Sequence, residues 1–203
     1  MPAIKALGPE QTTLIYLERI REDFPAAELK GLKQILRLME RGIYHGLGFF
    51  MDSGPEDAAE NPAGYLYYNV DPSDAGACLV DYLAVRKDLR GQGVGKEMLR
   101  LLRETCPEMK TWIVEVENPF REDNPEQRRM MAGRMGFYLQ SGFTDTGIDA
   151  RVFGVEFRLL SLSSPAVSPD AVRRCYERIY ANTIDPSVLK DELLIRTGAG
   201  PEA

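Results

Sequence analysis

Apolar side chains along the chain follow two spacings, one typical of helices and the other typical of strands. In two N-terminal segments, residues 14–24 and 29–39, apolar positions recur every three or four residues, which predicts two amphipathic helices. Short apolar runs bounded by turn residues predict strands. The predicted strands in the first half of the chain are residues 4–8, 44–52, 64–71 and 78–85.

Short links join the last three of these strands. An acidic loop that contains proline and glycine, residues 53–62, separates the first two of them, and residues 71–74 form a turn before the third. Because short connections join antiparallel neighbours, we expect these three strands to form a meander.

The pattern changes after residue 85. A polar, glycine-rich stretch leads into a helical stripe that ends near Pro107, and a strand at residues 112–117 follows. Strand, helix and strand in this order predict that 78–85 and 112–117 are parallel neighbours joined by a right-handed crossover. A further helix stops at Gly142, and residues 143–162 are predicted to form a hairpin that turns near Asp149. The sequence therefore predicts a mixed α/β fold, in which about seven strands, mostly antiparallel, include one parallel pair and are flanked by helices.

The C-terminal part has a different composition. Residues 161–169 are rich in serine and proline and are typical of a linker, and residues 172–179 form an amphipathic helix with a full apolar face. We expect one domain over residues 1–162, followed by a linker and a helical extension, 163–203, that packs on the domain. Residues 197–203 are expected to be a frayed tail.

Composition and charge narrow the possible functions. The 203 residues are 44% hydrophobic and 28% charged, which is typical of a soluble globular protein, and the net charge of −6 disfavours nonspecific binding to nucleic acid or to an anionic membrane. The apolar runs are far shorter than the roughly 18 to 20 residues of a membrane span, and no signal-peptide pattern opens the chain, so a cytoplasmic protein is expected.

Cysteine and histidine contribute little to the candidate chemistry. The three cysteines are widely separated and form no Cys/His cluster, so neither a disulfide framework nor a metal site is expected. His45 is the single histidine, lies in a predicted strand, and is expected to have a structural or surface role.

The clearest candidate motif is the sequence RGQGVGK at residues 90–96, between a strand and a helix. Backbone N–H groups and the helix dipole can bind phosphate oxygens at such a point. A P-loop would need Gly at position 90 and Ser or Thr at 97, where this chain has Arg90 and Glu97. A dinucleotide fingerprint, G-x-G-x-x-G, would need its third glycine at position 96, where this chain has Lys96. It would also have to follow its strand directly, whereas residues 86–90 intervene here. The pattern that remains is Arg/Gln-x-x-Gly-x-Gly/Ala, met by Arg90, Gly93 and Gly95.

This motif resembles the acyl-CoA loop of the GNAT superfamily of N-acyltransferases. The downstream segment FYLQSGF, residues 137–143, resembles the family's helix end, and the order of predicted elements over about residues 3–162 is also similar. The resemblance implies that acetyl-CoA binds with its pantetheine arm along the end of strand 78–85 and its pyrophosphate on the loop amides. The residues implied in this binding are Leu83, Ala84, Val85, Arg90, Gly91, Gln92, Gly93, Val94, Gly95 and Lys96.

The resemblance also implies catalytic residues. Tyr138 matches the family position whose hydroxyl can protonate the departing thiolate, although its place on an apolar stripe also fits a packing role. Glu115 matches a glutamate that some members use as general base, and strand alternation puts Glu117 on the same face. Glu117 and Asp81 are candidates for substrate binding. A plain solvent-exposed sheet face is the alternative for all three carboxylates.

The chain departs from the family pattern at two places. Many members carry an asparagine one helical stretch before the tyrosine, where this chain has Met131. The loop at residues 118–127 is longer than the usual connection, which suggests a lid or a substrate-specificity loop.

The resemblance favours an enzyme, a GNAT-type N-acetyltransferase that moves an acetyl group directly from acetyl-CoA to a primary amine, most simply that of a small molecule. Acetylation of a peptide amine fits the same chemistry. A catalytically silent acyl-CoA-binding or sensing module is the alternative from another class. No nucleic-acid or membrane partner is expected, and the sequence leaves open whether the protein is a monomer or a homodimer.

Overall fold

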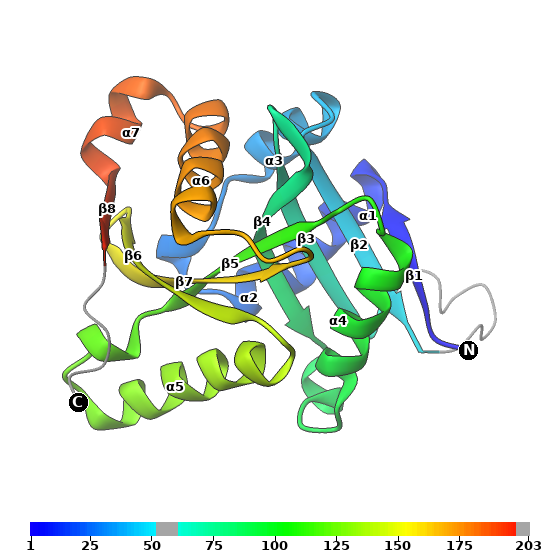
Figure 1. The fold of residues 1–203 in the computed structure, drawn as a ribbon. Coiled ribbons are helices and arrows are strands. Elements are labelled where there is room, and N and C mark those ends of the chain that lie inside the picture. The colour runs from blue at the N-terminus through cyan, green and yellow to red at the C-terminus, as the bar shows by residue number, and fades with distance from the viewer. Residues whose placement is uncertain (52–60, 198–203) are drawn as a thin grey trace. The chain divides into compact units, whose positions relative to one another are not determined.

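A computed structural model describes residues 1–51 and 61–197. Its eight strands follow the order β1-β2-β3-β4-β5-β7-β6-β8 in a mixed, mostly antiparallel sheet with one parallel pair, and helices flank the strands (Figure 1). The predicted fold class is confirmed, with eight strands in place of about seven. Contacts divide the described chain into two compact units, one from Met1–Asn69 with Val80–Glu108 and the other from Val70–Leu79 with Met109–Ala203.

The first unit contains an antiparallel meander. Strand β1 (Ala3–Leu7) pairs with β2 (Tyr44–Phe50), and β2 pairs with β3 (Gly64–Asp71). A two-residue turn leads into β4 (Asp74–Val85), which therefore starts four residues earlier than the sequence pattern predicts. The second half of β4 belongs to this unit. The unit also contains α1 (Pro9–Ile15), α2 (Arg21–Asp23), α3 (Leu32–Glu40) and α4 (Val94–Thr105).

The first helical segment buries only part of the apolar stripe predicted for it, which consists of Leu14, Leu17, Ile20 and Phe24. Leu14 and Leu17 are 48% and 51% exposed, whereas Ile15 and Ile20 are buried in the core of this unit. A π-helical turn, η1 (Tyr16–Ile20), joins α1 to α2 and brings residues five apart, in place of three or four apart, to the same side. The regular 3.6-residue spacing read from the sequence does not hold across such a turn.

The second unit is built on a hairpin and two long helices. Strand β5 (Thr111–Glu117) pairs antiparallel with β7 (Val155–Ser163), which pairs with β6 (Thr144–Val152). The turn predicted near Asp149 is wrong. The chain turns at Phe153 and Gly154, whose φ angles of 47° and 83° give the left-handed pair that a two-residue hairpin turn requires. The helices are α5 (Pro125–Gln140), α6 (Pro169–Thr183) and α7 (Pro186–Glu192).

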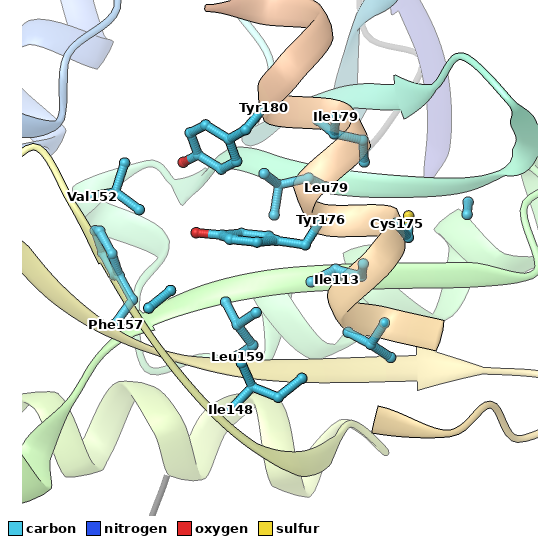
Figure 2. Packing of buried hydrophobic residues seen from close by; sticks show 13 residues of the cluster. Leu79, Ile113, Ile148, Val152, Phe157, Leu159, Cys175, Tyr176, Ile179 and Tyr180 are labelled. Atoms are coloured by element: carbon cyan, nitrogen blue, oxygen red, sulfur yellow. The ribbon is translucent and has the colours of Figure 1, made fainter. Parts of the chain in front are cut away.

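The C-terminal extension packs on the strands of the second unit. Figure 2 shows α6 laying Cys175, Tyr176 and Ile179 against Ile113 and Leu159 in one buried cluster. The Ser168 hydroxyl caps this helix by accepting a hydrogen bond from the amide of Ala171.

The extension is not only helical. It ends in a strand, β8 (Leu193–Thr197), that pairs with β6 and that the sequence pattern did not predict. The predicted frayed tail beyond Thr197 and the predicted acidic loop up to residue 60 lie outside the described residues. In the described part of the chain, each helix is too short or too polar to span a membrane.

Candidate active site

The glycine loop lies in the first unit, between the end of β4 and the start of α4. Gly91 and Gly93 have φ angles of 76° and 83°, in the left-handed region that residues with a Cβ atom rarely adopt. A Cβ atom built on either glycine would meet nothing within 4 Å, so the loop surface above them is open. Because the first amides of a helix have no acceptor inside the helix, the start of α4 suits an anionic group.

The cations beside this loop are already engaged by protein groups. The Arg90 guanidinium donates from Nε to the Val85 carbonyl at 2.9 Å and from Nη2 to Asp23 at 2.6 Å. Arg86 forms a two-pronged pair with Asp88, at 2.7 and 3.0 Å. These pairs shape the loop, and they leave the backbone amides as the groups best placed to hold a phosphate.

Asp81 lies on β4, where strand alternation puts it on the same face as Leu83 and Val85. Its carboxylate accepts hydrogen bonds from the Lys30 ammonium at 2.5 Å and from the Tyr44 hydroxyl at 2.6 Å. Burial and the neighbouring Asp81 charge raise the pKa of Tyr44 well above its ordinary value, so this hydroxyl stays a donor. Nothing in the sequence pattern indicates Lys30, which lies 51 positions from Asp81.

Glu115 lies on β5 in the second unit, and its carboxylate meets the C-terminal helix α6. Its Oε1 atom accepts hydrogen bonds from the hydroxyls of Tyr176 and Tyr180, the second at 2.7 Å. Burial and the Glu115 charge raise the pKa of Tyr176 well above the ordinary value, which keeps this phenol protonated. The structure therefore joins one predicted catalytic residue to two tyrosines of the C-terminal helix.

Glu117 is held by a different helix. Its carboxylate forms an ion pair with Arg134 of α5, and its side chain is 17% exposed. The two carboxylates of β5 are thus engaged from α6 and from α5, and Arg134 is a partner that sequence reasoning missed.

Tyr138 lies in the last turn of α5, one turn beyond Arg134. Its ring packs edge-on against Phe137 and Phe143, with centroids 5.0 and 5.2 Å away. Burial raises the pKa of Tyr138 to about 12, so the phenol carries its proton at neutral pH. Within residues 1–51 and 61–197, the Tyr138 hydroxyl has no hydrogen-bond partner, so it can donate a hydrogen bond to a bound group.

The start of the loop predicted as a lid is anchored by a buried polar network. Asp149 accepts hydrogen bonds from Arg158 at 2.8 Å and from the Asn118 side chain at 2.9 Å, and all three residues are at most 3% exposed. Arg121 reaches the other oxygen of the same carboxylate at 3.4 Å. This network ties the short helix η5 (Pro119–Arg121) to the β6–β7 hairpin.

His45 lies apart from these groups. Its ring stacks on Tyr68, with centroids 5.2 Å apart, and it lines a groove of about 850 Å³ beside α3 and β2. None of the predicted site residues lines this groove.

The acetyltransferase (GNAT) family model matches residues 15–137, which are more than half of the chain. This chain belongs to the acetyltransferase (GNAT) family. The match includes the glycine loop and β5 and ends one residue before Tyr138. The search of curated proteins found no match.

Solved GNAT structures share the fold. A protein from Bacteroides thetaiotaomicron described as a GNAT-family acetyltransferase is 19% identical, with a TM-score of 0.64 over 90% of this chain and 99% of that one. NAA60 from Arabidopsis thaliana, solved with acetyl-CoA, is 13% identical, with a TM-score of 0.59 over 82% and 100%. A chimera of spermidine N-acetyltransferase SpeG from Vibrio cholerae and hSSAT is 11% identical, with a TM-score of 0.55 over 81% and 96%.

Proposed function

We propose that this GNAT protein transfers an acetyl group directly from acetyl-CoA to a primary amine of a small molecule. The observation that carries the proposal is the open loop at the start of α4, where Gly91 and Gly93 adopt left-handed backbone conformations. Membership of the family supports acetyl transfer as the reaction, and the complex of NAA60 with acetyl-CoA supports this donor.

Backbone groups would do most of the donor binding. The amides of residues 91–96 would hold the pyrophosphate, and the β4 backbone at Leu83, Ala84 and Val85 would pair with the pantetheine arm. Arg90 would act mainly on the loop, because its guanidinium binds the Val85 carbonyl and Asp23. The bound donor supplies an acetyl group activated as a thioester.

Two side chains of this chain would take part in proton transfer, one by accepting a proton from the amine and the other by donating to the departing sulfur. An amine attacks only when it is deprotonated, and we assign Glu115, directly or through water, to accept that proton. As the new C–N bond forms and the C–S bond breaks, the departing sulfur needs a proton or a hydrogen-bond donor. We assign this role to Tyr138, because it matches the family position whose hydroxyl serves the leaving sulfur, and its phenol carries a proton at neutral pH.

A cationic acceptor is the substrate class favoured by the acidic residues on β4 and β5. Asp81 and Glu117 could bind its ammonium group, and each already has a cationic partner, Lys30 and Arg134 respectively. An acceptor that reaches either carboxylate would compete with that lysine or arginine. The SpeG chimera, a spermidine N-acetyltransferase, is one neighbour consistent with a small amine acceptor.

The test is release of CoA thiol from acetyl-CoA across a panel of small amines and peptides, with products identified by mass spectrometry. Acetylation of small amines is expected. If only peptides are acetylated, a peptide amine replaces the small-molecule amine as the acceptor. If CoA binds but no amine gives a product, the catalytically silent acyl-CoA-binding module is favoured. Tyr138→Phe should lower turnover while the affinity for acetyl-CoA, measured by calorimetry, stays nearly unchanged. Unchanged turnover would remove Tyr138 from the mechanism.

A further inference from the structure

The C-terminal helix places two hydroxyls on one carboxylate oxygen. Tyr176 and Tyr180 are one helical turn apart on α6, and both hydroxyls donate to Oε1 of Glu115. Figure 2 shows both rings leaving the same side of α6 with their hydroxyls directed the same way. Both tyrosines lie outside the span matched by the family model, residues 15–137.

We propose that Tyr176 and Tyr180 are positioning residues that orient Glu115 and hold it in its ionised form. The inference rests on the proposed function, in which Glu115 accepts the proton of the acceptor amine. It adds to the GNAT fold a contribution from the C-terminal extension, which thereby becomes part of the catalytic machinery of this chain.

Packing alone does not account for the two hydroxyls. Tyr176 is completely buried and Tyr180 is 4% exposed, and both rings belong to the apolar cluster of the second unit. A phenylalanine at either position would fill the same space without the cost of burying a hydroxyl, which is unfavourable unless the hydroxyl is hydrogen-bonded. The placement of both hydroxyls on one carboxylate oxygen therefore points to a requirement at Glu115.

Hydrogen bonds to the charged form of a carboxyl group stabilise that form. The hydroxyls of Tyr176 and Tyr180 supply such bonds to Oε1 of Glu115. Burial and the Glu115 charge raise the pKa of Tyr176 well above its ordinary value, which keeps this phenol a donor. A fixed Oε1 also fixes the plane of the carboxylate, and hence the direction in which it accepts a proton.

The other charged groups around Glu115 have partners of their own. Glu117, two residues along β5, pairs with Arg134 of α5. Arg178, on α6 between the two tyrosines, is bound to Asp71. On β7 the residue opposite Glu115 is Leu159, which carries no charge. On α6, burial raises the pKa of Cys175 to about 12, so its thiol stays neutral.

Loss of a donor should destabilise the anion, so Glu115 should take up its proton at a higher pH. A hydrogen bond to a charged group changes the protonation equilibrium by a factor of about ten. Each lost hydroxyl should therefore shift the acidic limb of the kcat/KM profile upward by about one pH unit. The affinity for acetyl-CoA should not change.

The experiment compares Tyr176→Phe, Tyr180→Phe and the double variant in the full chain. Thr183→Val is the matched control, because it removes a hydroxyl from the same helix whose acceptors are the Ile179 and Tyr180 carbonyls. A carboxyl titration followed by NMR on ¹³C-glutamate-labelled protein, with Glu115→Gln to assign the signal, needs no acceptor amine. The kcat/KM profile is measured with an amine from the panel.

An upward shift of the Glu115 titration and of the acidic limb in the tyrosine variants, with the control unchanged, supports the proposal. Folded single variants that titrate as the wild type does would overturn it, even if the double variant failed to fold. Loss of the limb in Glu115→Gln without any shift in the tyrosine variants would overturn only the positioning role. An intact limb in Glu115→Gln would overturn the assignment of the base on which that role rests.

Discussion

Replacement of Asp149 by alanine tests whether the buried network beneath the 118–121 segment stabilises the protein. Asp149 and Arg158 are 3% and 2% exposed, so neither group can replace a lost partner with bulk water. The carboxylate accepts from Arg158 at 2.8 Å and from Asn118 at 2.9 Å. The alanine variant leaves both donors without this acceptor.

The magnitude follows from what remains bound to Arg158. Removal of one partner of a buried ion pair costs about 3–5 kcal/mol. Arg158 keeps two hydrogen bonds to Asp145, at 2.6 and 3.1 Å, so we expect the lower end, about 3 kcal/mol. For a chain of this length this corresponds to a fall in Tm of about 6–12 °C. Asp145→Ala should cost less, about 1.5 kcal/mol, because that carboxylate is 29% exposed and Arg158 keeps Asp149.

Urea unfolding followed by the fluorescence of Trp112 measures both free energies. Trp112 is the single tryptophan and is buried on β5, in the same unit as the network. Asp145→Ala is the matched control, since it removes a carboxylate from the same guanidinium at a more exposed position. If Asp149→Ala lowers the free energy of unfolding by no more than Asp145→Ala does, the reasoning from burial is refuted.

Three further outcomes follow from single positions. Gly46→Ala should lower the free energy of unfolding by about 2 kcal/mol, because its Cβ would lie 2.5 Å from the buried ring of Tyr67. Gly133→Ala, in an open helical position, should raise it by about 1 kcal/mol. Thermal unfolding measures both variants, and equal effects would contradict the packing argument. Burial raises the pKa of Tyr138 from 10 to about 12, so its stabilising contribution is complete below pH 10 and lost as the pH rises to 12. The difference in tyrosinate absorbance between the wild type and Tyr138→Phe reports this residue and should titrate near pH 12. A midpoint near pH 10 would argue against burial. Burial raises the pKa of Cys175 to about 12, so alkylation of its thiol at mildly alkaline pH should be slow in the native protein and fast after unfolding. Peptide mass spectrometry measures the labelling, and rapid labelling of the native protein would contradict the raised pKa.

Much of the fold could be predicted because it depends on local patterns. Alternating and 3.6-residue spacings locate the meander, the crossover helix α4 and the hairpin. The errors have local physical causes as well. A π-helical turn leaves Leu14 and Leu17 exposed while Ile15 and Ile20 are buried. The left-handed Phe153 and Gly154 move the hairpin turn away from Asp149.

The candidate site divides in the same way. The glycine loop is readable from sequence, since Gly91 and Gly93 stand where the backbone needs positive φ. The roles of Tyr138 and Glu115 stay predictions, drawn from the family resemblance. Nothing in the spacing of residues indicates that Lys30 binds Asp81.

The sequence by itself determined most of the strands and helices, β8 excepted, because local spacing depends on neighbours a few residues apart. It also determined where the chain can present a phosphate-binding loop. Only the tertiary structure decided what each carboxylate touches. Glu115 and Tyr176 are 61 positions apart, and Asp81 and Lys30 are 51 apart. Such contacts form when packing of the apolar faces brings distant segments together, and the polar partners are selected by that packing rather than by any local pattern.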